Sequence, residues 1–223
     1  MSFVNYFPVY LDLNGRPVLI VGGGSVAIEK LNSLLPSGAV ITVVSPTAGP
    51  EILAWAREAR ITLIEREFGP TDIEGAFMVI AATDVPSLNA EVFRLGNAAL
   101  KLTNSVDDPV NCNFIMSANA KSGPMQVAIS SAGCSPALAQ RVRNRIAAEL
   151  LGPEVGEIAK FLGSWRPAVK RALPSYKIRQ RFWESILDEG ISDVLATEGL
   201  ESANRWMQAE LAAAASLVGV PSK

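Results

Sequence analysis

The sequence predicts an α/β protein that begins with a parallel sheet, continues with a small α+β region and ends in helices alone. Over residues 17–106, short β-branched or apolar segments alternate with segments of helical spacing, a pattern typical of parallel strands joined by helical crossovers. After residue 113 this alternation stops, and from residue 153 the apolar spacing is helical throughout. We therefore expect three parts, residues 1–113, 114–150 and 151–223.

The first part shows five strand patterns and three helix patterns. An alternating apolar segment at residues 7–13 precedes a tight-turn signal at Asn14 and Gly15. Strands are expected at residues 18–21, 40–44, 61–64, 77–82 and 102–106, and helices at residues 26–35, 50–60 and 86–100. Strand and helix alternate in this order, which predicts a parallel sheet covered by helices.

The second and third parts lose the strand–helix alternation. Strands at residues 114–117 and 125–130, with a polar turn at residues 119–124, predict a hairpin. Ser135 and Pro136 then supply an N-cap and a first-turn proline for a helix over residues 137–151. The remaining helices are expected at residues 157–163, 166–173, 177–188, 191–195 and 200–218.

A glycine-rich loop follows the first core strand and precedes a helix. Gly22, Gly24 and Ala27 fit the G-x-G-x-x-G/A fingerprint of a dinucleotide-binding turn. Gly22 allows the tight turn, and Gly24 lets a pyrophosphate approach the backbone. The N–H groups around Ser25 and Val26 then face the phosphates at the positive end of the helix. Glycine triplets also occur in flexible loops and plain strand–helix turns, but the strand before this triplet and the helix after it favour a Rossmann-type NAD-binding domain.

Ligands of such a sheet bind beyond the carboxyl ends of the strands. The second strand ends in Ser45, Pro46 and Thr47, without the acidic residue that usually binds the adenosine ribose. A hydroxyl or backbone group there can bind the ribose instead. No arginine follows to pair with a 2′-phosphate, which favours NAD over NADP. Thr83, after the fourth strand, belongs to the same set of expected cofactor contacts.

The composition limits the possible chemistry and location. The chain has no histidine, so proton transfer depends on Asp, Glu, Lys, Tyr, Cys or water. Cys112 and Cys134 form no C-x-x-C pair, which fits a reducing cytoplasm and predicts no metal site. The net charge is −2, the start lacks a secretion signal, and no apolar run can span a bilayer. We expect a cytoplasmic protein without a membrane partner.

Asp107, Asp108 and Pro109 end the fifth strand. Asp before Pro is common in turns, so these residues can simply stabilise a bend. Alternatively, a carboxylate beside the nicotinamide can exchange a proton with the substrate, and two adjacent carboxylates can raise each other's pKa. The residues alone leave the two interpretations open.

Two further segments have both a structural and a functional interpretation. The turn at residues 130–136 is either a capped helix start or an anion-binding entrance, and Cys134 within it is either a nucleophile or a small packing residue. Residues 160–183 carry seven cations and no acid. They form a solvated helical face, a nucleic-acid surface or a site for a polycarboxylate. The acidic chain as a whole makes nucleic acid the weaker choice.

Six segments in order resemble one known family, that of the siroheme synthase N-terminal module, the precorrin-2 dehydrogenase and sirohydrochlorin ferrochelatase family. The resemblance covers essentially the whole chain and rests on residues 19–27, 80–84, 104–109, 114–116, 130–136 and 181–184. It implies a homodimer built from a Rossmann domain, a small dimerisation region at residues 114–150 and a helical tail. It also implies oxidation of precorrin-2 to sirohydrochlorin with NAD⁺, and in many members insertion of Fe²⁺ as a substrate.

The resemblance assigns roles to particular residues. Asp107 matches the catalytic aspartate, Asn104 and Ser131 match tetrapyrrole-site positions, and Pro46 and Thr47 join the glycine loop in binding NAD. The carboxylate-rich tetrapyrrole suits the basic segment 160–183. This sequence departs from the family pattern at two places. Ala132 replaces a usual glycine, and Asp108 adds a charge beside Asp107.

Two other functions fit the residues if the resemblance is set aside. One is a dehydrogenase of another carboxylate substrate. The other is a non-enzymatic NAD(H)-sensing module, as in redox repressors, but a repressor needs a DNA-reading helix-turn-helix for which the sequence shows no convincing segment. Retained NAD without turnover of any tetrapyrrole would favour the sensor.

Overall fold

The computed structural model of the chain describes residues 4–218 and divides into two compact units, Met1–Met116 and Ser117–Lys223. Each unit has its own hydrophobic core. The boundary between the units follows shortly after residue 113, where the strand–helix alternation of the sequence stops. A further division at residue 150 stays a prediction.

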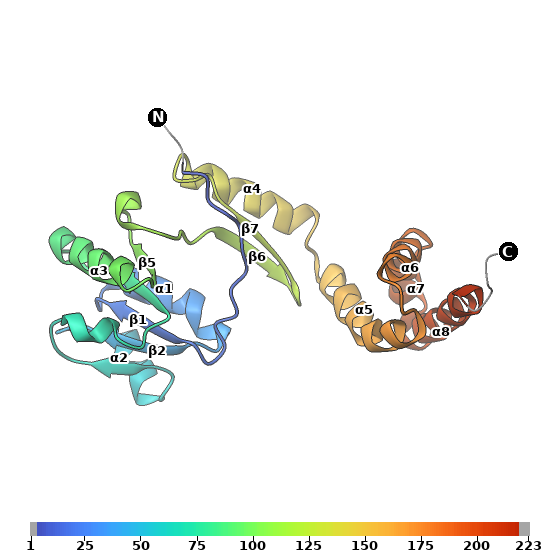
Figure 1. The fold of residues 1–223 in the computed structure, drawn as a ribbon, viewed down its shortest axis with the longest axis horizontal. Helices are drawn as coiled ribbons and strands as arrows, with labels where there is room; N and C mark the ends of the chain where they lie inside the picture. The colour runs from blue at the N-terminus through green and yellow to red at the C-terminus, as the bar shows by residue number, and fades with distance from the viewer. Residues whose placement is uncertain (1–3, 219–223) are drawn as a thin grey trace. The chain divides into compact units, whose positions relative to one another are not determined.

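The first unit is built on a five-stranded parallel sheet, which confirms the predicted fold class (Figure 1). The strands lie in the order β3-β2-β1-β4-β5, and Val21 of β1 is opposite Val44 on one side and Ala81 on the other. Their bounds are Pro17–Val21 (β1), Val40–Val44 (β2), Thr62–Ile64 (β3), Met78–Ala81 (β4) and Leu102–Ser105 (β5). The chain proceeds outward from β1 in one direction and then from β4 in the other. The carboxyl ends of β1 and β4 therefore form the topological switch point where such sheets bind ligands.

Helices cover both faces of this sheet. On one face α1 (Ser25–Leu34) and α2 (Pro50–Arg57) pack against Val18 and Ile20 of β1. On the other face α3 (Pro86–Ala98) packs against Leu19 and Val21. These four residues are buried because helices cover both faces of the sheet, as expected for a parallel strand of β-branched and apolar residues. Three short 3₁₀ segments complete the connections, at Leu35–Ser37 (η1), Pro70–Ile73 (η2) and Pro109–Asn111 (η3).

The predicted hairpin exists in the second unit, with its second strand where expected, but the expected bounds of its first strand and turn were wrong. β6 (Ala118–Ser122) pairs antiparallel with β7 (Met125–Ile129), so residues 119–122 are strand and the turn consists of Gly123 and Pro124. The polar residues Asn119 and Lys121 occupy the exposed positions of β6, a strand alternation that the sequence reading took for a turn. Gly123 has φ +54°, which favours glycine at the turn.

Residues 114–117, expected as a strand, do not belong to the hairpin. Phe114 O accepts a hydrogen bond from Asn104 Nδ2 of β5 (3.0 Å), and Asn113 N–H donates to Thr103 O (3.0 Å). These bonds hold the start of the segment against β5, so it cannot pair with β7. After the hairpin, α4 (Pro136–Glu149) packs along β6 and β7 (Figure 1).

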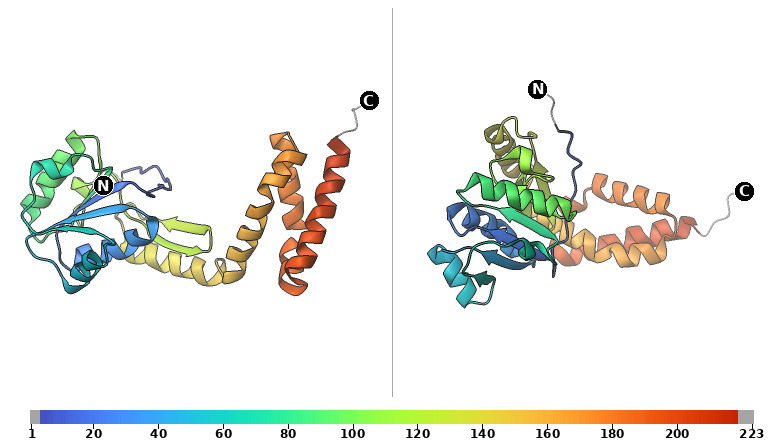
Figure 2. Two further views of the ribbon diagram at one scale, coloured as in Figure 1. Left: turned by 90° about the horizontal axis from the view of Figure 1, so that it is seen from below. Right: turned by 60° about the vertical axis from the view of Figure 1, so that its left-hand side comes forward.

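The rest of the second unit is helical, as predicted. It comprises α5 (Pro153–Ala172), α6 (Tyr176–Asp188), α7 (Ile191–Thr197) and α8 (Gly199–Val218), with α5, α6 and α8 side by side in Figure 2. The two helices expected at residues 157–163 and 166–173 are one continuous helix. Phe161 and Val169 both enter the same core, and this packing outweighs the helix-breaking tendency of Pro167 between them. Within residues 4–218, no helix has the length and apolar character needed to cross a bilayer.

An ion pair near β3 and β4 gives the first unit a defined pH response. The Arg66 guanidinium donates to both oxygens of Asp72 (2.6 and 2.8 Å), and Gly69 N–H donates to the same carboxylate (2.8 Å). The Asp72 side chain is only 8% exposed. The hydrogen bonds from Arg66 are the main cause that lowers the pKa of Asp72 below its usual 3.8.

We expect Asp72→Asn to be less stable than the wild type at pH 7. Because the folded-state pKa is lowered, the stabilisation is fully present above the unfolded-state pKa and is lost as pH falls through the folded value. The difference between the two proteins should therefore shrink below about pH 4. Urea unfolding of both at pH 7, 5, 4 and 3 measures it. Glu58→Gln, in the exposed pair with Arg60 (3.5 Å), is the control and should change little.

Candidate functional site

Five of the predicted positions lie at one edge of the first unit's sheet. Gly22 follows β1, Ser45 follows β2, Thr83 follows β4, and Asn104 and Asp107 lie at the end of β5. Because these strands are parallel, their carboxyl ends meet at the same edge. Ser131 belongs to the second unit.

Gly22 and Gly23 let neighbouring loops approach closely. Gly22 has φ +118°, its N–H donates to Val44 O (3.0 Å), and a Cβ on it would collide with Ala82 O. A Cβ on Gly23 would collide with Thr47 O. The two glycines therefore join the loops after β1, β2 and β4. The sequence reading missed the role of Gly23, although the middle glycine of the triplet was a visible signal.

Gly24 differs from its neighbours because the space beside it is open. A Cβ there would meet no atom within 4 Å, and the residue is exposed. It is the N-cap of α1, where no side chain caps the helix and no acid lies in the first turn. The N–H groups of Ser25 and Val26 precede the first α-helical bond, from Ile28 N–H to Gly24 O (3.1 Å). This open, positive helix end fits the pyrophosphate of a dinucleotide.

The residues of the loop after β2 differ in their exposure to solvent. Ser45 is buried, and its hydroxyl donates to Thr47 O (2.6 Å). That hydroxyl holds the loop closed around Gly23, so its proton is not free for a ribose. Pro46 and Thr47 are exposed.

Asn89 of α3 fixes the loop after β4 and was not foreseen. Its Oδ1 accepts hydrogen bonds from the Thr83 hydroxyl (2.7 Å) and Thr83 N–H (3.2 Å). Its Nδ2 donates to Thr83 O (2.9 Å). Asn89 is buried, so the bonds take place in a low-dielectric setting where they rigidify the loop. An asparagine within a predicted helix was the available signal.

Asp107 lies in a tight turn after β5. Asp108 N–H donates to Ser105 O (3.2 Å), and Asp107 adopts φ +59° within that turn. Asp is among the residues that tolerate this left-handed conformation. Asp107 is exposed, whereas the Asp108 carboxylate accepts a hydrogen bond from Asn111 Nδ2 (2.6 Å). The two adjacent acids therefore have different roles, and Asp107 is the one free to meet a ligand.

Cys112 is hydrogen-bonded to the turn that contains Asp107. Its thiol lies 3.2 Å from both Ser105 O and Asp108 O, to which it can donate, and it accepts from Asn104 Nδ2 (3.3 Å). Asn104 is buried, and its amide nitrogen donates to Cys112 Sγ and Phe114 O. Burial is the main cause that raises the pKa of the Cys112 thiol, and the Asp108 charge raises it further.

We expect the two cysteines to react at different rates. Cys134 is exposed, whereas Cys112 is half-buried with a raised pKa and thus less of the reactive thiolate at pH 8. N-ethylmaleimide should label Cys134 at least several-fold faster, as measured by peptide mass spectrometry over time. Cys134→Ser should remove the fast phase, and unfolding in urea should equalise the rates. Equal rates in the native protein would contradict the burial of Cys112.

Ser131 lies in a turn that leads into α4. Its Oγ accepts from Ser135 N–H (3.0 Å), so its own hydroxyl proton remains available. Ala132, at the position where the family resemblance expects glycine, adopts φ +51°, and Ala132 N–H donates to Ser130 Oγ (2.9 Å). The alanine therefore adopts a left-handed conformation that favours glycine, at some energetic cost.

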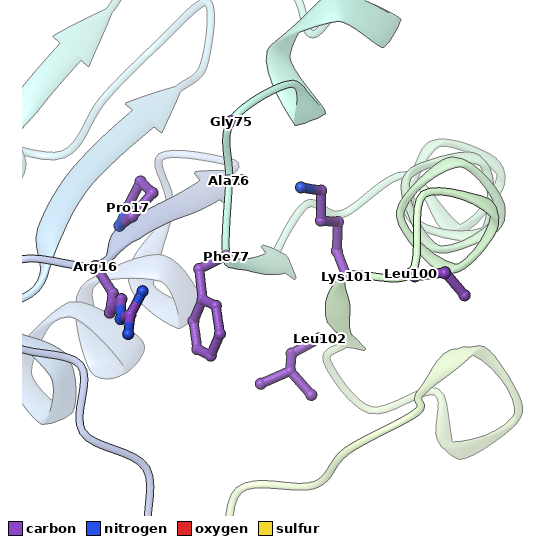
Figure 3. Close-up of a pocket in the computed structure, with 8 residues that line it drawn as sticks. All are labelled: Arg16, Pro17, Gly75, Ala76, Phe77, Leu100, Lys101 and Leu102. Atoms are coloured by element: carbon purple, nitrogen blue, oxygen red, sulfur yellow. The ribbon is translucent and has the colours of Figure 1, made fainter.

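The pocket in Figure 3 lies at the opposite edge of the sheet. It has a volume of about 340 Å³ and is formed at the amino ends of β1, β4 and β5. The residues that line it are Arg16, Pro17, Gly75, Ala76, Phe77, Leu100, Lys101 and Leu102. The Arg16 guanidinium stacks over the Phe77 ring, 5.6 Å from its centroid. This pocket is separate from the glycine loop, which lies at the carboxyl ends.

Among residues 4–218, no three His, Cys, Asp or Glu side chains gather in a way that could hold a metal ion. A glycine loop between β1 and α1, at the carboxyl edge of a parallel sheet, is the geometry of a dinucleotide-binding α/β domain of the NAD(P) type. Residues 9–118 match the family model described as putative NAD(P)-binding.

Two further family models match the remainder of the chain. Residues 122–149 match the central region of sirohaem biosynthesis proteins, and residues 154–211 match the sirohaem synthase dimerisation region. The three models together cover most of the chain, which confirms the resemblance to the siroheme synthase N-terminal module family seen in the sequence.

Curated relatives and a solved structure agree with this family. The chain is 39% identical over 208 residues to the siroheme synthase of Mannheimia succiniciproducens, covering 93% of this chain and 44% of that protein. It is 42% identical over 181 residues to the siroheme synthase of Neisseria meningitidis, covering 81% of this chain and 37% of that protein. The chain spans less than half the length of these two relatives. A solved structure of SirC, a precorrin-2 dehydrogenase, matches with a TM-score of 0.74 and 27% identity over 92% of this chain and 98% of that one.

Proposed function

We propose that this protein oxidises precorrin-2 to sirohydrochlorin with NAD⁺. The observation that carries the proposal is the pairing of an open, uncapped helix end at Gly24 with an exposed carboxylate at Asp107, on one edge of the sheet. The names of the similar proteins, siroheme synthase and precorrin-2 dehydrogenase, support the choice of substrate.

The oxidation removes a hydride and a proton from precorrin-2. NAD⁺, when bound, supplies the hydride acceptor. The chain supplies the proton acceptor, for which we propose the Asp107 carboxylate, since the chain has no histidine. The glycine loop, Ser25 and Val26 would hold the pyrophosphate, and Pro46, Thr47 and the Thr83 loop would contact the rest of the dinucleotide. Ser45 contributes by shaping its loop, and Asn104 by holding the Asp107 turn.

The residues around the β2 loop support NAD rather than NADP. The first cation after β2 is Arg57, at the end of α2, and Glu51 occupies the first turn of that helix. The loop after β2 therefore offers no cation that could pair with a 2′-phosphate.

Insertion of Fe²⁺ into sirohydrochlorin is a second proposed activity of the same site. Metal insertion releases two protons from the tetrapyrrole, and the exposed Asp107 carboxylate can accept one of them. Fe²⁺ enters here as a substrate. Ser131, whose hydroxyl can still donate a hydrogen bond, is the proposed contact to the tetrapyrrole.

We also propose that the protein works as a homodimer with a three-part organisation. The match of residues 154–211 to a dimerisation region supports self-association. Separate family models for residues 9–118, 122–149 and 154–211 support boundaries near residues 113 and 150. Sedimentation of the purified chain tests the dimer.

Anaerobic incubation of the purified protein with precorrin-2 and NAD⁺ tests the main proposal. We expect NADH and sirohydrochlorin to form in equal amounts, as measured by the absorbance of each product. Adding Fe²⁺ or Co²⁺ afterwards tests metal insertion. Turnover of another carboxylate instead of precorrin-2 would identify a different dehydrogenase. Tight NAD⁺ binding with no turnover would identify a sensor and contradict the proposal.

A further inference from the structure

The thiol of Cys112 bonds to the backbone on both sides of Asp107. The sulfur lies 3.2 Å from Ser105 O, at the end of β5, and 3.2 Å from Asp108 O, directly after Asp107. It also accepts a hydrogen bond from Asn104 Nδ2 (3.3 Å). One side chain therefore spans the turn that carries the exposed carboxylate, and all of these residues belong to the first unit.

The backbone of this turn adopts a conformation that needs support from its surroundings. Asp108 N–H donates to Ser105 O at 3.2 Å, and Asn111 N–H donates to Asp108 O (3.0 Å). Between them Asp107 has φ +59°, a left-handed conformation that costs roughly 1 kcal/mol for a residue with a Cβ. Such a conformation persists where neighbouring contacts over-determine it. The Cys112 thiol provides contacts of this kind at both ends of the turn.

Cys112 belongs to a segment that is itself fixed to the buried strand β5. Asn104 and Cys112 form an isolated antiparallel bridge, and Asn104 Nδ2 also donates to Phe114 O (3.0 Å). The neighbouring Asn113 accepts from Thr103 N–H through its Oδ1 (2.7 Å) and donates to Thr103 O through its own N–H (3.0 Å). The thiol therefore connects a segment held firmly by the sheet with an exposed turn.

The surroundings of Cys112 suit a hydrogen-bond donor and do not suit a nucleophile. Burial raises the pKa of the thiol, and the charge of Asp108 raises it further. The S–H group is therefore retained at neutral pH and can donate to the two backbone oxygens. A nucleophilic cysteine needs the thiolate, which electropositive surroundings favour.

We propose that Cys112 is a positioning residue for Asp107, which rests on the proposed function. The thiol holds Ser105 O and Asp108 O on either side of Asp107, so that the turn presents the carboxylate in one geometry. A general base must lie within hydrogen-bond reach of the proton that it removes, and a small misplacement of a reacting group lowers the rate. Cys112 itself neither contacts the substrate nor transfers a proton.

Anaerobic kinetics of precorrin-2 oxidation test this role. Cys112→Ala removes the donor and should lower kcat about 5- to 20-fold, with KM and the Kd for NAD⁺ unchanged. Cys112→Val fills the space without a donor and should show the same loss, which separates the hydrogen bonds from a cavity effect. Cys112→Ser keeps a donor and should stay within about threefold of wild type. Ile52→Val, a truncation in the core beneath α2, is the control for lost stability and should keep the wild-type kcat.

A double substitution distinguishes positioning from a general structural effect. If Cys112 acts through Asp107, adding Cys112→Ala to Asp107→Asn should lower kcat by less than about twofold more. Losses that multiply in the double variant would overturn the proposal, as would a wild-type kcat in both Cys112→Ala and Cys112→Val.

Hydrogen exchange of the amides of residues 105–112 provides a readout that needs no turnover. Exchange there should be faster in Cys112→Ala and close to wild type in Ile52→Val. Equal exchange in Cys112→Ala and the wild type would overturn the contact between the thiol and the turn. A wild type that does not oxidise precorrin-2 would refute the proposed function, and the exchange result would still decide whether Cys112 holds the turn.

Discussion

Asp107→Asn should lower the kcat of precorrin-2 oxidation by roughly 10²- to 10⁴-fold, the usual contribution of a positioned general base. Asparagine has nearly the same shape and tolerates the left-handed conformation that Asp107 adopts (φ +59°). The loss would therefore report the missing carboxylate and not a strained turn. The Kd for NAD⁺ and the melting temperature should stay close to wild type, because Asp107 is exposed.

Asp108→Asn is the matched control for this prediction. It removes the same charge from the next residue, but its carboxylate accepts from Asn111 Nδ2 (2.6 Å) and is turned to that structural role. We expect a small loss of stability and a kcat within a few-fold of wild type. Steady-state kinetics under anaerobic conditions measure both variants. Unchanged turnover in Asp107→Asn would remove Asp107 from the mechanism, and equal losses in both variants would indicate a general effect of charge.

Gly22→Ala should reduce the stability of the protein, whereas Gly24→Ala should reduce its affinity for NAD⁺. At Gly22 a Cβ collides with Ala82 O and the backbone has φ +118°, so we expect a loss of about 2–4 kcal/mol in the free energy of unfolding. At Gly24 the backbone is extended (φ −87°, ψ −169°) and a Cβ meets no atom within 4 Å. The alanine there should fold normally but weaken NAD⁺ binding roughly 10- to 100-fold, because it occupies the space that the pyrophosphate needs.

Two measurements separate these effects. Urea unfolding without ligand should show the loss in Gly22→Ala alone. Isothermal titration with NAD⁺ should show the loss of affinity in Gly24→Ala at unchanged stability. Gly15→Ala is a useful reference, because Gly15 has a positive φ of +67° but no neighbour within 4 Å and therefore isolates the conformational cost. Normal NAD⁺ affinity in Gly24→Ala would contradict the assignment of the pyrophosphate to the α1 N-terminus.

Local patterns in the sequence were sufficient for the sheet and the glycine loop. The apolar runs of β1 and β2, the fingerprint at Gly22 and Gly24, and the turn at Asp107 each depend on residues that are close in the chain. The first strand of the hairpin was misplaced because alternating polar side chains at Asn119 and Lys121 resemble a turn when their partner strand is unknown. Helix α5 was divided for a similar reason, since Pro167 is a breaker by local rules.

Several site features depend on contacts that residue spacing does not reveal. Gly23 is needed because the Thr47 carbonyl approaches it, and Asn89 is needed because it holds Thr83 through hydrogen bonds. The hydrogen bonds of Cys112 to Ser105 and Asp108 give its thiol a structural role that its spacing did not indicate. No periodicity encodes such contacts, because they arise only when loops fold against one another.

The sequence by itself determined the fold class, the family resemblance, the glycine loop and the aspartate after β5, since each follows from spacing and residue type along the chain. Tertiary structure decided which of these side chains are exposed and unpaired. The Ser45 hydroxyl bonds within its own loop, the Asn104 amide bonds to Phe114 O, and Asp107 is exposed. Burial and hydrogen-bond satisfaction are properties of packed surroundings, and packing brings together residues whose separation in sequence carries no signal.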